Sequence, residues 1–391
     1  MKLLTNRFWQ IAIFLLAICT LHLAGLLPHA HAATASLGAF AFAGAIIGGN
    51  ALTYADWAKR MDDDGKVATI IELLSQTNEI MDDMLLVESN GPTSHKTTVR
   101  TGLPQATWRL LNYGVPNGKS TTAQIVDTMG NLETYSVIDK DIADLNGNTA
   151  EFRLSEDMPF LEGMNQQMAE TLFYGNTSTN PERFMGLSPR YNSVSTATAQ
   201  TANNVIDAGG TGSTNASLWL VTWGPNSCHG IFPKGKIAGL QHKDMGEWPV
   251  ADVNGNTYQA YRTHFKWELG LTVRDWRYLV RVANIDVTLL SGGNAANLIN
   301  AMIRAVHRVP TTPRRVSTEQ RTDAPDGGQM SMGRMAFYAN RTLRTYLDIQ
   351  AVNKTNVLLR LEEWDGMPVT TFRGIPIRTC DQLLSTEARL V

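Results

Sequence analysis

Cysteine is scarce in this chain of 391 residues: Cys19, Cys228 and Cys380 lie far apart in the sequence. So few and so scattered thiols exclude a disulfide framework and a zinc cluster. We expect Cys228 and Cys380 to be small buried hydrophobic residues.

An excess of charge of either sign is also missing. Lys plus Arg total 34 against 36 Asp plus Glu, and charged residues make up 18% of the chain. A protein that gathers nucleic acid by releasing counterions needs a positive field, so this balance excludes a dedicated DNA-binding protein. The 43% hydrophobic content is ordinary for a globular chain with a substantial core.

Motifs that carry chemistry are absent or defective. No Gly-x-Ser-x-Gly elbow, Gly-x-Gly-x-x-Gly fingerprint or His-Glu-x-x-His pair occurs. Residues 230–237 approach a phosphate-binding loop, but Ile237 replaces the hydroxyl residue and Pro233 removes an amide. Residues 144–148 and 252–256 resemble the start of calcium loops but lack the late glutamate, so we predict turns. We therefore expect no catalytic residue, no cofactor and no metal.

The N-terminus has the pattern of a secretory signal peptide. Lys2 and Arg7 precede the apolar residues 11–27, and small residues follow at Ala30 and Ala32. The composition changes abruptly after residue 50. We hypothesise that residues 1–50 come from a start codon placed too far upstream or form a leader that is removed, which an intact-mass measurement on purified particles would decide.

An amphipathic arm and a long hairpin are predicted next. Thr53 and Asp56 indicate the start of a helix, and residues 62–84 have helical spacing of apolar residues. Residues 96–112 and 119–140 read as extended strands around a turn rich in glycine and proline. A two-stranded ribbon is marginal in water by itself, so this hairpin should need a neighbouring subunit as its partner surface.

A long helix should begin at Thr149, with Asn148 and Glu151 forming a capping box and Pro159 causing a kink or a new first turn. Its apolar stripe comprises Leu161, Met164, Met168 and Leu172.

The rest of the chain mixes strands and helices. The polar residues 196–217 are expected to be an exposed loop. Strands are expected at 218–223, 230–232, 258–267 paired with 271–285, and 357–379, and helices at 292–310 and 331–351. Because strands and helices do not alternate regularly, the fold class is α+β.

Several segments, in this order, resemble the major capsid proteins of tailed bacteriophages, in particular a podovirus and prophage subfamily. They are LTYADWAKRM at 52–61, TVRTGLP at 98–104 with WRLLN at 108–112, LFYGN at 172–176 with FMGL at 184–187, VTWGPN at 221–226, FPKG at 232–235, YLVRVANID at 278–286, and GIPI at 374–377 with Asp381. The resemblance covers residues 51–391.

This resemblance implies an HK97-like capsid fold. Beyond the leader at 1–50, the expected divisions are an N-terminal arm at 51–95, an extended loop hairpin at 96–140, a spine helix and peripheral domain at 141–202, and an axial domain at 203–391 whose closing strands return to the peripheral domain.

The implied function is structural. Subunits would form hexamers and pentamers of an icosahedral shell that encloses double-stranded DNA without sequence-specific binding, with portal and scaffolding proteins as further partners and no membrane in the mature particle. Assembly would take place in the host cytoplasm, with which the signal-like leader conflicts. We assign the subunit interface to Arg100, Trp108, Arg109, Lys119, Arg314 and Arg315.

Two other interpretations stay open on the sequence alone. An encapsulin-like compartment would use the same fold to enclose an enzyme. An exported surface or binding protein would follow if the leader is genuine.

Overall fold

The computed structural model describes residues 52–53, 56, 75–252, 254–292, 296–310, 334–352, 359–364 and 367–391. The leader, most of the predicted arm helix, and Arg314 and Arg315 lie outside these residues. The chain divides into two units, residues 1–49 and 50–391, and all elements below belong to the second.

The strands are β1 (Leu86–Glu88), β2 (Ser94–Gly102), β3 (Thr121–Asp139), β4 (Val205–Asp207), β5 (Asn215–Trp223), β6 (Cys228–Phe232), β7 (Leu240–Ala251), β8 (Thr257–Val273), β9 (Leu279–Asp286), β10 (Arg334–Ala339), β11 (Leu359–Trp364), β12 (Met367–Phe372) and β13 (Ile375–Thr379). The helices are α3 (Ile80–Asp83), α4 (Lys140–Ala143), α5 (Thr149–Tyr174), α6 (Leu298–Arg308) and α7 (Arg341–Val352), with short 3-10 turns η1 (Leu145–Gly147), η2 (Ser188–Tyr191), η3 (Gln200–Asn204), η4 (Trp276–Tyr278) and η5 (Val287–Leu289).

The strands form one mixed sheet. Its order is β11-β12-β13-β10-β5-β6-β8-β3-β2, while β1, β7 and β9 pair with β6, β8 and β5, and β4 pairs with β9. The α+β class with segregated helices is confirmed.

β5 lies at the centre of two hydrophobic cores. Its residues are all buried, as the apolar run from Leu218 to Val221 indicates for a strand covered on both faces. Trp219 and Val221 pack into the core that contains the end of α5, whereas Leu218 and Leu220 pack into the core that contains α6 and α7. Successive side chains of β5 point to opposite faces of the sheet, and this alternation separates the two cores.

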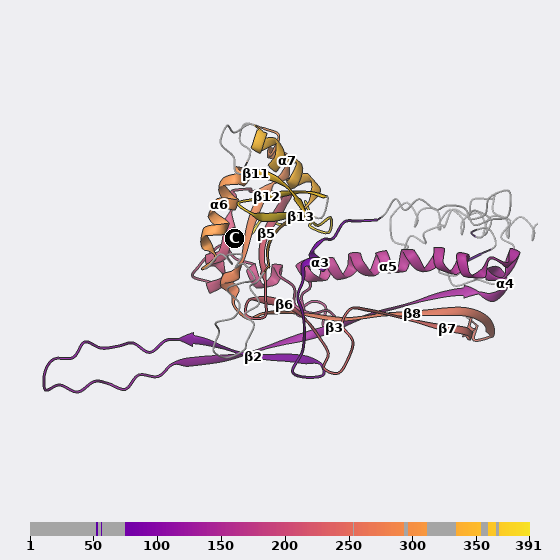
Figure 1. Ribbon diagram of the computed structural model, residues 1–391, viewed down its shortest axis with the longest axis horizontal. Helices are drawn as coiled ribbons and strands as arrows, with labels where there is room; N and C mark the ends of the chain where they lie inside the picture. Colours follow the sequence, from indigo (N-terminus) through magenta and orange to yellow (C-terminus); the bar gives the residue numbers. More distant parts are fainter. Residues whose placement is uncertain are drawn as a thin grey trace, which may run out of the picture. The chain divides into compact units, whose positions relative to one another are not determined.

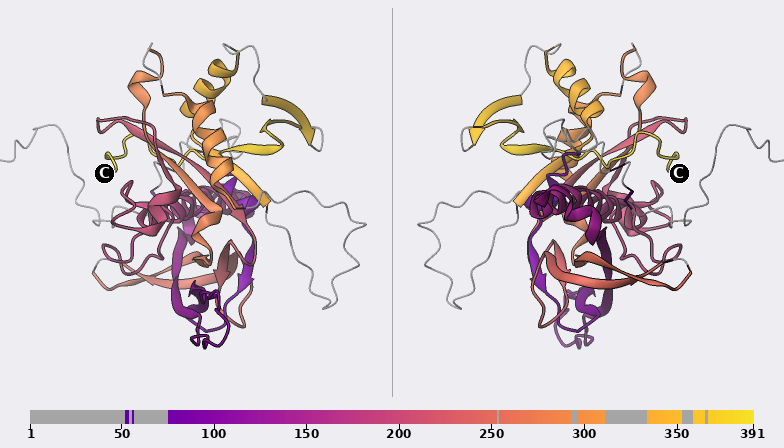
Figure 2. Two further views of the ribbon diagram at one scale, coloured as in Figure 1. Left: turned by 90° about the vertical axis from the view of Figure 1, so that its left-hand side faces the viewer. Right: turned by 90° about the vertical axis from the view of Figure 1, so that its right-hand side faces the viewer.

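Helix α5 lies along the sheet formed by β3 and β8, beside the root of the hairpin β2–β3 (Figure 1). Phe160 stacks on Phe265 of β8, and Phe173 contacts Trp219 of β5. In both views of Figure 2 the yellow strands β11–β13 and the helices α6 and α7 lie at the opposite end from the indigo hairpin.

The helix starts are partly as predicted. Thr53 and Asp56 form a reciprocal capping pair, with Thr53 Oγ1 donating to Asp56 Oδ2 at 2.7 Å and Asp56 N to Thr53 Oγ1 at 3.4 Å. The capping box at Asn148 is wrong, because Asn148 makes no side-chain cap hydrogen bond. Pro159 lies inside the continuous helix α5.

The predicted exposed loop at 196–217 is wrong in part, since residues 211–214 are exposed but residues 204–206 and 215–217 are buried. Val205, Ile206 and Asn215 are buried, and β4 and the start of β5 fall in this stretch. The polar side chains that suggested a loop find partners inside the protein: Asn215 Nδ2 donates to Gly212 O at 2.7 Å and Asn204 Nδ2 to Leu279 O at 2.8 Å.

The predicted pairing of 258–267 with 271–285 is also wrong. β8 continues through Gly270, and a Cβ there would lie only 2.8 Å from Thr128 O and from Met129 Cγ. Glycine therefore permits a close approach of β3 and does not mark a turn. β8 pairs with β7, which the sequence analysis missed, and β9 pairs with β5.

The expected helix at 331–351 is a strand followed by a helix. β10 lies between β13 and β5 with Phe337 and Tyr338 fully buried, so tertiary packing overrides the local helical pattern. Helix α6 begins at Leu298, later than expected, with Asn297 as its N-cap. The closing strands at 357–379 are confirmed as β11, β12 and β13.

Candidate assembly site: the extended hairpin and the arm root

The hairpin β2–β3 is paired only near the rest of the sheet. β2 runs antiparallel to β3 from Ser94 opposite Thr128 to Gly102 opposite Thr121. Beyond this point residues 103–120 contain no strand, so the first predicted strand ends earlier than expected. In Figure 1 this segment forms the far end of the projecting hairpin.

The tip of the hairpin is apolar and uncovered. Every residue from 103 to 120 is exposed. Trp108 is 100% exposed, and Leu111 is 85% exposed. Together with Leu103, Leu110 and Tyr113 they form an apolar group of the kind that marks a protein interaction surface.

The outer part of the same hairpin carries charge of one sign. Residues 96–126 contain Lys96, Arg100, Arg109 and Lys119 but no Asp or Glu. Within the described residues, the side chains of Arg100, Trp108, Arg109 and Lys119 make no hydrogen bond or ion pair with the rest of the chain. Arg100 therefore lies on β2, and Trp108, Arg109 and Lys119 lie in the tip segment 103–120, while Arg314 and Arg315 lie outside the described residues.

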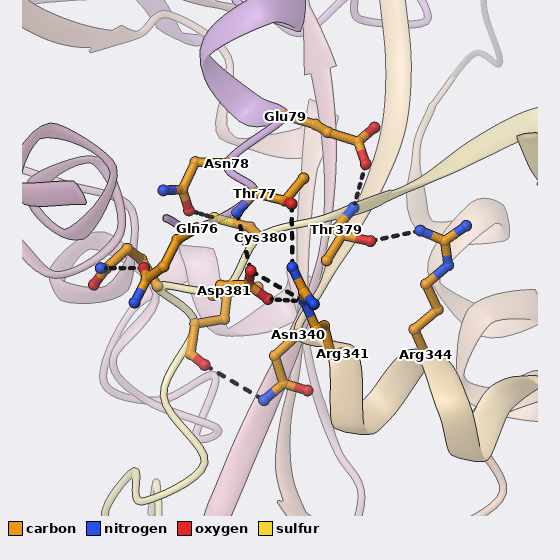
Figure 3. A network of polar contacts seen from close by, with 12 residues as sticks. Gln76, Thr77, Asn78, Glu79, Asn340, Arg341, Arg344, Thr379, Cys380 and Asp381 are labelled. Atoms are coloured by element: carbon orange, nitrogen blue, oxygen red, sulfur yellow. Dashed lines mark hydrogen bonds and ion pairs between the residues drawn. The ribbon is translucent and has the colours of Figure 1, made fainter. Parts of the chain in front are cut away.

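A second assembly feature is the root of the N-terminal arm, which is fastened to the closing segment of the chain (Figure 3). Thr77 N donates to Asp381 Oδ2 at 3.0 Å, and Asp381 N donates back to Thr77 O at 3.0 Å. Gln382 Nε2 donates to Gln76 Oε1 at 2.6 Å, and Gln76 N donates to Glu162 of α5 at 2.8 Å. The arm therefore starts from a fixed position between α5 and the end of the chain.

Two arginines of α7 complete this root by bonding to the end of β13 and to Asp381. Arg341 Nε donates to Asp381 Oδ1 at 2.9 Å, and Arg344 Nη1 donates to Thr379 Oγ1 at 2.5 Å (Figure 3). A hollow of about 450 Å³ lies beside them, lined by Thr77, Glu79, Arg341, Arg344, Thr345, Asp348 and Thr379. Its two arginines face two carboxylates, so it offers no net charge that would select an anion.

Beneath the root, α3 is held by a buried polar chain. Arg378 Nε donates to Asp83 Oδ2 at 3.1 Å, and Tyr338 Oη donates to the same oxygen at 3.0 Å. Trp223 Nε1 donates to Tyr338 Oη at 2.7 Å. This chain links the arm root to the central strand β5.

The described residues offer no metal site, and their two cysteines are buried. No cluster of His, Cys, Asp or Glu within the described part of the chain has the geometry to hold a metal ion. Burial raises the pKa of Cys228 and of Cys380 to about 12, as expected for inert core thiols. Among the helices that the structure describes, none has the length and apolar character to cross a membrane.

Comparison with known proteins gives the family. The family model of the major capsid protein GP7 matches residues 62–391. This chain belongs to that family. It is a structural shell protein of a phage capsid, so the expected HK97-like fold and capsid function are confirmed.

One solved structure supports this assignment. A chain in the structure of bacteriophage epsilon15 is 38% identical, covers 89% of this chain and 99% of its own length, and superposes with a TM-score of 0.65. The capsid of bacteriophage JBD30 (10% identity, 80% of this chain and 92% of that chain, TM-score 0.43) and the capsid of a native GTA particle (9%, 56% and 93%, TM-score 0.41) are much weaker likenesses. None of the curated proteins matches this chain.

Two buried ion pairs of this capsid protein were missed by the sequence analysis. Asp127 on the hairpin strand β3 pairs with Arg190 at 2.8 Å, and Arg281 on β9 pairs with Glu387 near the C-terminus at 2.8 Å. Their partners are 63 and 106 residues apart, so no local pattern signals them.

Proposed function

We propose that this capsid protein assembles with copies of itself into hexamers and pentamers of an icosahedral shell that encloses double-stranded DNA, and that its hairpin lies on the neighbouring copy. The observation that supports this is the tip at 103–120, which is exposed throughout, contains several large apolar side chains, and carries positive charges that have no acidic partner among the described residues. Arg100, Trp108, Arg109 and Lys119 are the proposed contacts on this hairpin, and Arg314 and Arg315 belong to the same proposed interface.

We also propose the division into a leader at 1–50, an arm at 51–95, the hairpin at 96–140, a peripheral domain at 141–202 and an axial domain at 203–391. Because β8 pairs with β3 and β7 pairs with β8, residues 240–273 contribute to the hairpin's sheet. Portal and scaffolding proteins are the further partners of this scheme, and assembly takes place in the host cytoplasm.

The test is to express the full chain and residues 51–391 and to image the products by cryo-electron microscopy. Closed shells support the proposal, and their nucleic acid content separates a genome container from an encapsulin-like compartment, which would hold a cargo protein. Soluble monomers processed on export would contradict it.

Trp108 provides the residue-level test of the hairpin contact. Because large aromatic residues dominate interface energetics, Trp108→Ala should weaken subunit association by about 2 kcal/mol or more per contact and raise the protein concentration needed for assembly. Trp108→Phe is the matched control and should retain assembly. Thermal unfolding of the unassembled subunit should be the same in both variants, because Trp108 is 100% exposed in the single chain. If Trp108→Ala assembles like the wild type, the tip is not part of the interface.

A further inference from the structure

The hairpin leaves the rest of the sheet at one point of β3. Up to Thr128, β3 pairs with β2, and from Met129 onward it pairs with β8. Directly before this change of partner, Asp127 lies opposite His95 of β2. Side chains at this point are therefore placed to set the direction in which the hairpin projects.

Asp127 is connected to the body of the protein through Arg190. The Asp127 side chain is 4% exposed, and its Oδ1 accepts a hydrogen bond from Arg190 Nη2 at 2.8 Å. The same nitrogen donates to Leu271 O of β8 at 3.1 Å and to Met185 O at 3.3 Å. Because Arg190 bonds both Asp127 of β3 and the Leu271 carbonyl of β8, it holds the hairpin strand against β8. Removal of either charged partner would leave the other as an uncompensated buried charge.

Two imidazoles lie beside this pair. The rings of His95 on β2 and His229 on β6 meet edge to face with centroids 5.8 Å apart. His95 Nδ1 accepts a hydrogen bond from the backbone N–H of Asn90 at 3.2 Å, which requires that this nitrogen carry no proton. Asn90 in turn holds the start of β2, because its side chain donates to Lys96 O at 2.6 Å and accepts from Lys96 N at 2.9 Å.

The surrounding groups keep both imidazoles neutral near pH 7. The titratable and charged side chains around them are Asp127 from β3, Arg190 from η2, Cys228 from β6, and Arg274, which follows β8. Burial is the largest cause that lowers the pKa of His229, to about 4, and burial followed by Arg274 lowers the pKa of His95. Asp127 acts in the opposite direction on both.

Three buried atoms of the cluster have no hydrogen-bond partner within the described residues: Asp127 Oδ2, Arg190 Nε and His229 Nδ1. Protonation of His229 adds a charge to a cluster in which buried polar atoms already lack partners. The backbone of Gly224 is the group that most favours the charged form of His229.

We propose that His95, Asp127, Arg190 and His229 form a proton-sensitive joint, which fixes the direction of the hairpin while both imidazoles are neutral and releases it when they are protonated. A proton on His95 Nδ1 removes the acceptor of the Asn90 N–H. A proton on His229 places a new positive charge against His95 and Arg274.

The sign of the pH dependence follows from the lowered pKa values. Because the folded joint favours the neutral imidazoles, its stabilising contribution is complete above the ordinary histidine value of 6.5 and is lost as the pH falls from there through the folded value of about 4 for His229. This joint concerns the single chain and does not depend on where the hairpin docks.

Hydrogen exchange of the full chain tests the joint, at concentrations below those that permit assembly and after correction for the intrinsic pH dependence of exchange. Peptides from β2 should lose protection by about tenfold between pH 7 and pH 4.5, relative to peptides from the fully buried strand β5. An equal change in both peptides would overturn the proposal, since it would report general unfolding.

Variants separate the roles of the imidazoles and the carboxylate. The double variant His95→Gln and His229→Gln cannot gain charge, so its β2 peptides should keep their protection at pH 4.5 and match the wild type at pH 7. Asp127→Asn should expose the β2 peptides already at pH 7 while those of β5 stay protected. If the double variant retains the wild-type pH profile, or Asp127→Asn leaves β2 protection unchanged, the joint is wrong. Failure of the subunits to form shells would contradict the proposed function and leave this result standing.

Discussion

Arg281 and Glu387 form the most deeply buried ion pair described in this capsid protein, with side chains 4% and 7% exposed. Glu387 Oε1 also accepts from Tyr174 Oη at 2.6 Å, and Ser217 Oγ donates to Oε2 while accepting from Arg281 Nε at 3.0 Å. Burial, followed by the nearby Glu387, raises the pKa of Tyr174, so the phenol remains a donor. The last turn of α5, β5, β9 and the C-terminal segment thus meet at one carboxylate.

Breaking this pair from one side should be strongly destabilising. Arg281→Met leaves Glu387 as a buried charge without its cation, so the free energy of unfolding should fall by about 3–5 kcal/mol. Urea denaturation of the unassembled subunit measures the change. Arg277→Met is the matched control: Arg277 pairs with Asp275 at 2.7 Å, but its side chain is 55% exposed. That pair should contribute at most about 1 kcal/mol, and equal losses for the two variants would show that burial does not govern the effect.

At the scale of elements, α5 has one buried face and one uncovered face. Met164, Met168 and Leu172 are buried, as the predicted stripe requires, whereas Leu154 and Met158 near the start of the helix are exposed. The helix forms although Asn148 gives no side-chain cap bond and Pro159 lies inside it. Packing of the apolar stripe against the sheet, and not the terminal signals, therefore stabilises this helix.

Met168→Ala tests this point. Met168 is 3% exposed and belongs to the core shared with Trp219 and Tyr338, so its truncation leaves a cavity. We expect a loss of about 2–5 kcal/mol in unfolding free energy by urea denaturation. Leu154→Ala on the same helix changes a side chain that is 64% exposed and should have little effect. Because alanine is the best helix former, a helix-propensity penalty cannot explain a loss in either variant.

At the scale of the whole molecule, the C-terminal segment closes the structure without being a strand or a helix. Leu390 N donates to Asn284 Oδ1 at 2.8 Å, and Asn284 Nδ2 donates back to Leu390 O at 3.0 Å. Glu387 N donates to Asn215 O at 2.8 Å, and Val194 N to Val391 O at 3.2 Å. The segment thereby connects β5, β9 and the loop after α5.

Deletion of residues 386–391 should therefore destabilise parts of the protein that lie far from this segment in the sequence. It removes the anion from buried Arg281 and the partner of Tyr174, so we expect a lower unfolding midpoint and faster proteolysis at 194–217 than in the full chain. Leu384→Ala is the control, because Leu384 is 45% exposed and contributes its backbone N–H to Tyr174 Oη. A truncated chain as stable and as protease-resistant as the full chain would contradict this role.

Local patterns in the sequence determined much of this protein. The hairpin strands, the helix from Thr149, the turn at 252–256 and the closing strands follow from the period of the apolar residues and from glycine and proline positions, which act over a few neighbours. The hairpin's need for a partner surface was also predicted, because a two-stranded ribbon is marginal in water by itself. Its apolar tip without acidic residues was not part of that prediction. The order of motifs along residues 51–391 indicated the capsid family, which the family model and the epsilon15 chain confirm.

Tertiary structure alone decided where burial overrides local preference. β10 is a strand because it lies between β5 and β13, Asn204 is buried because its amide meets the distant Leu279 carbonyl, and β8 passes through Gly270 because β3 approaches there too closely for a side chain. The ion pairs Asp127–Arg190 and Arg281–Glu387 likewise connect residues that are distant in the chain. A single sequence shows which side chains can pair, but the energy of a buried charge depends on the partner that folding brings within about 3 Å of it.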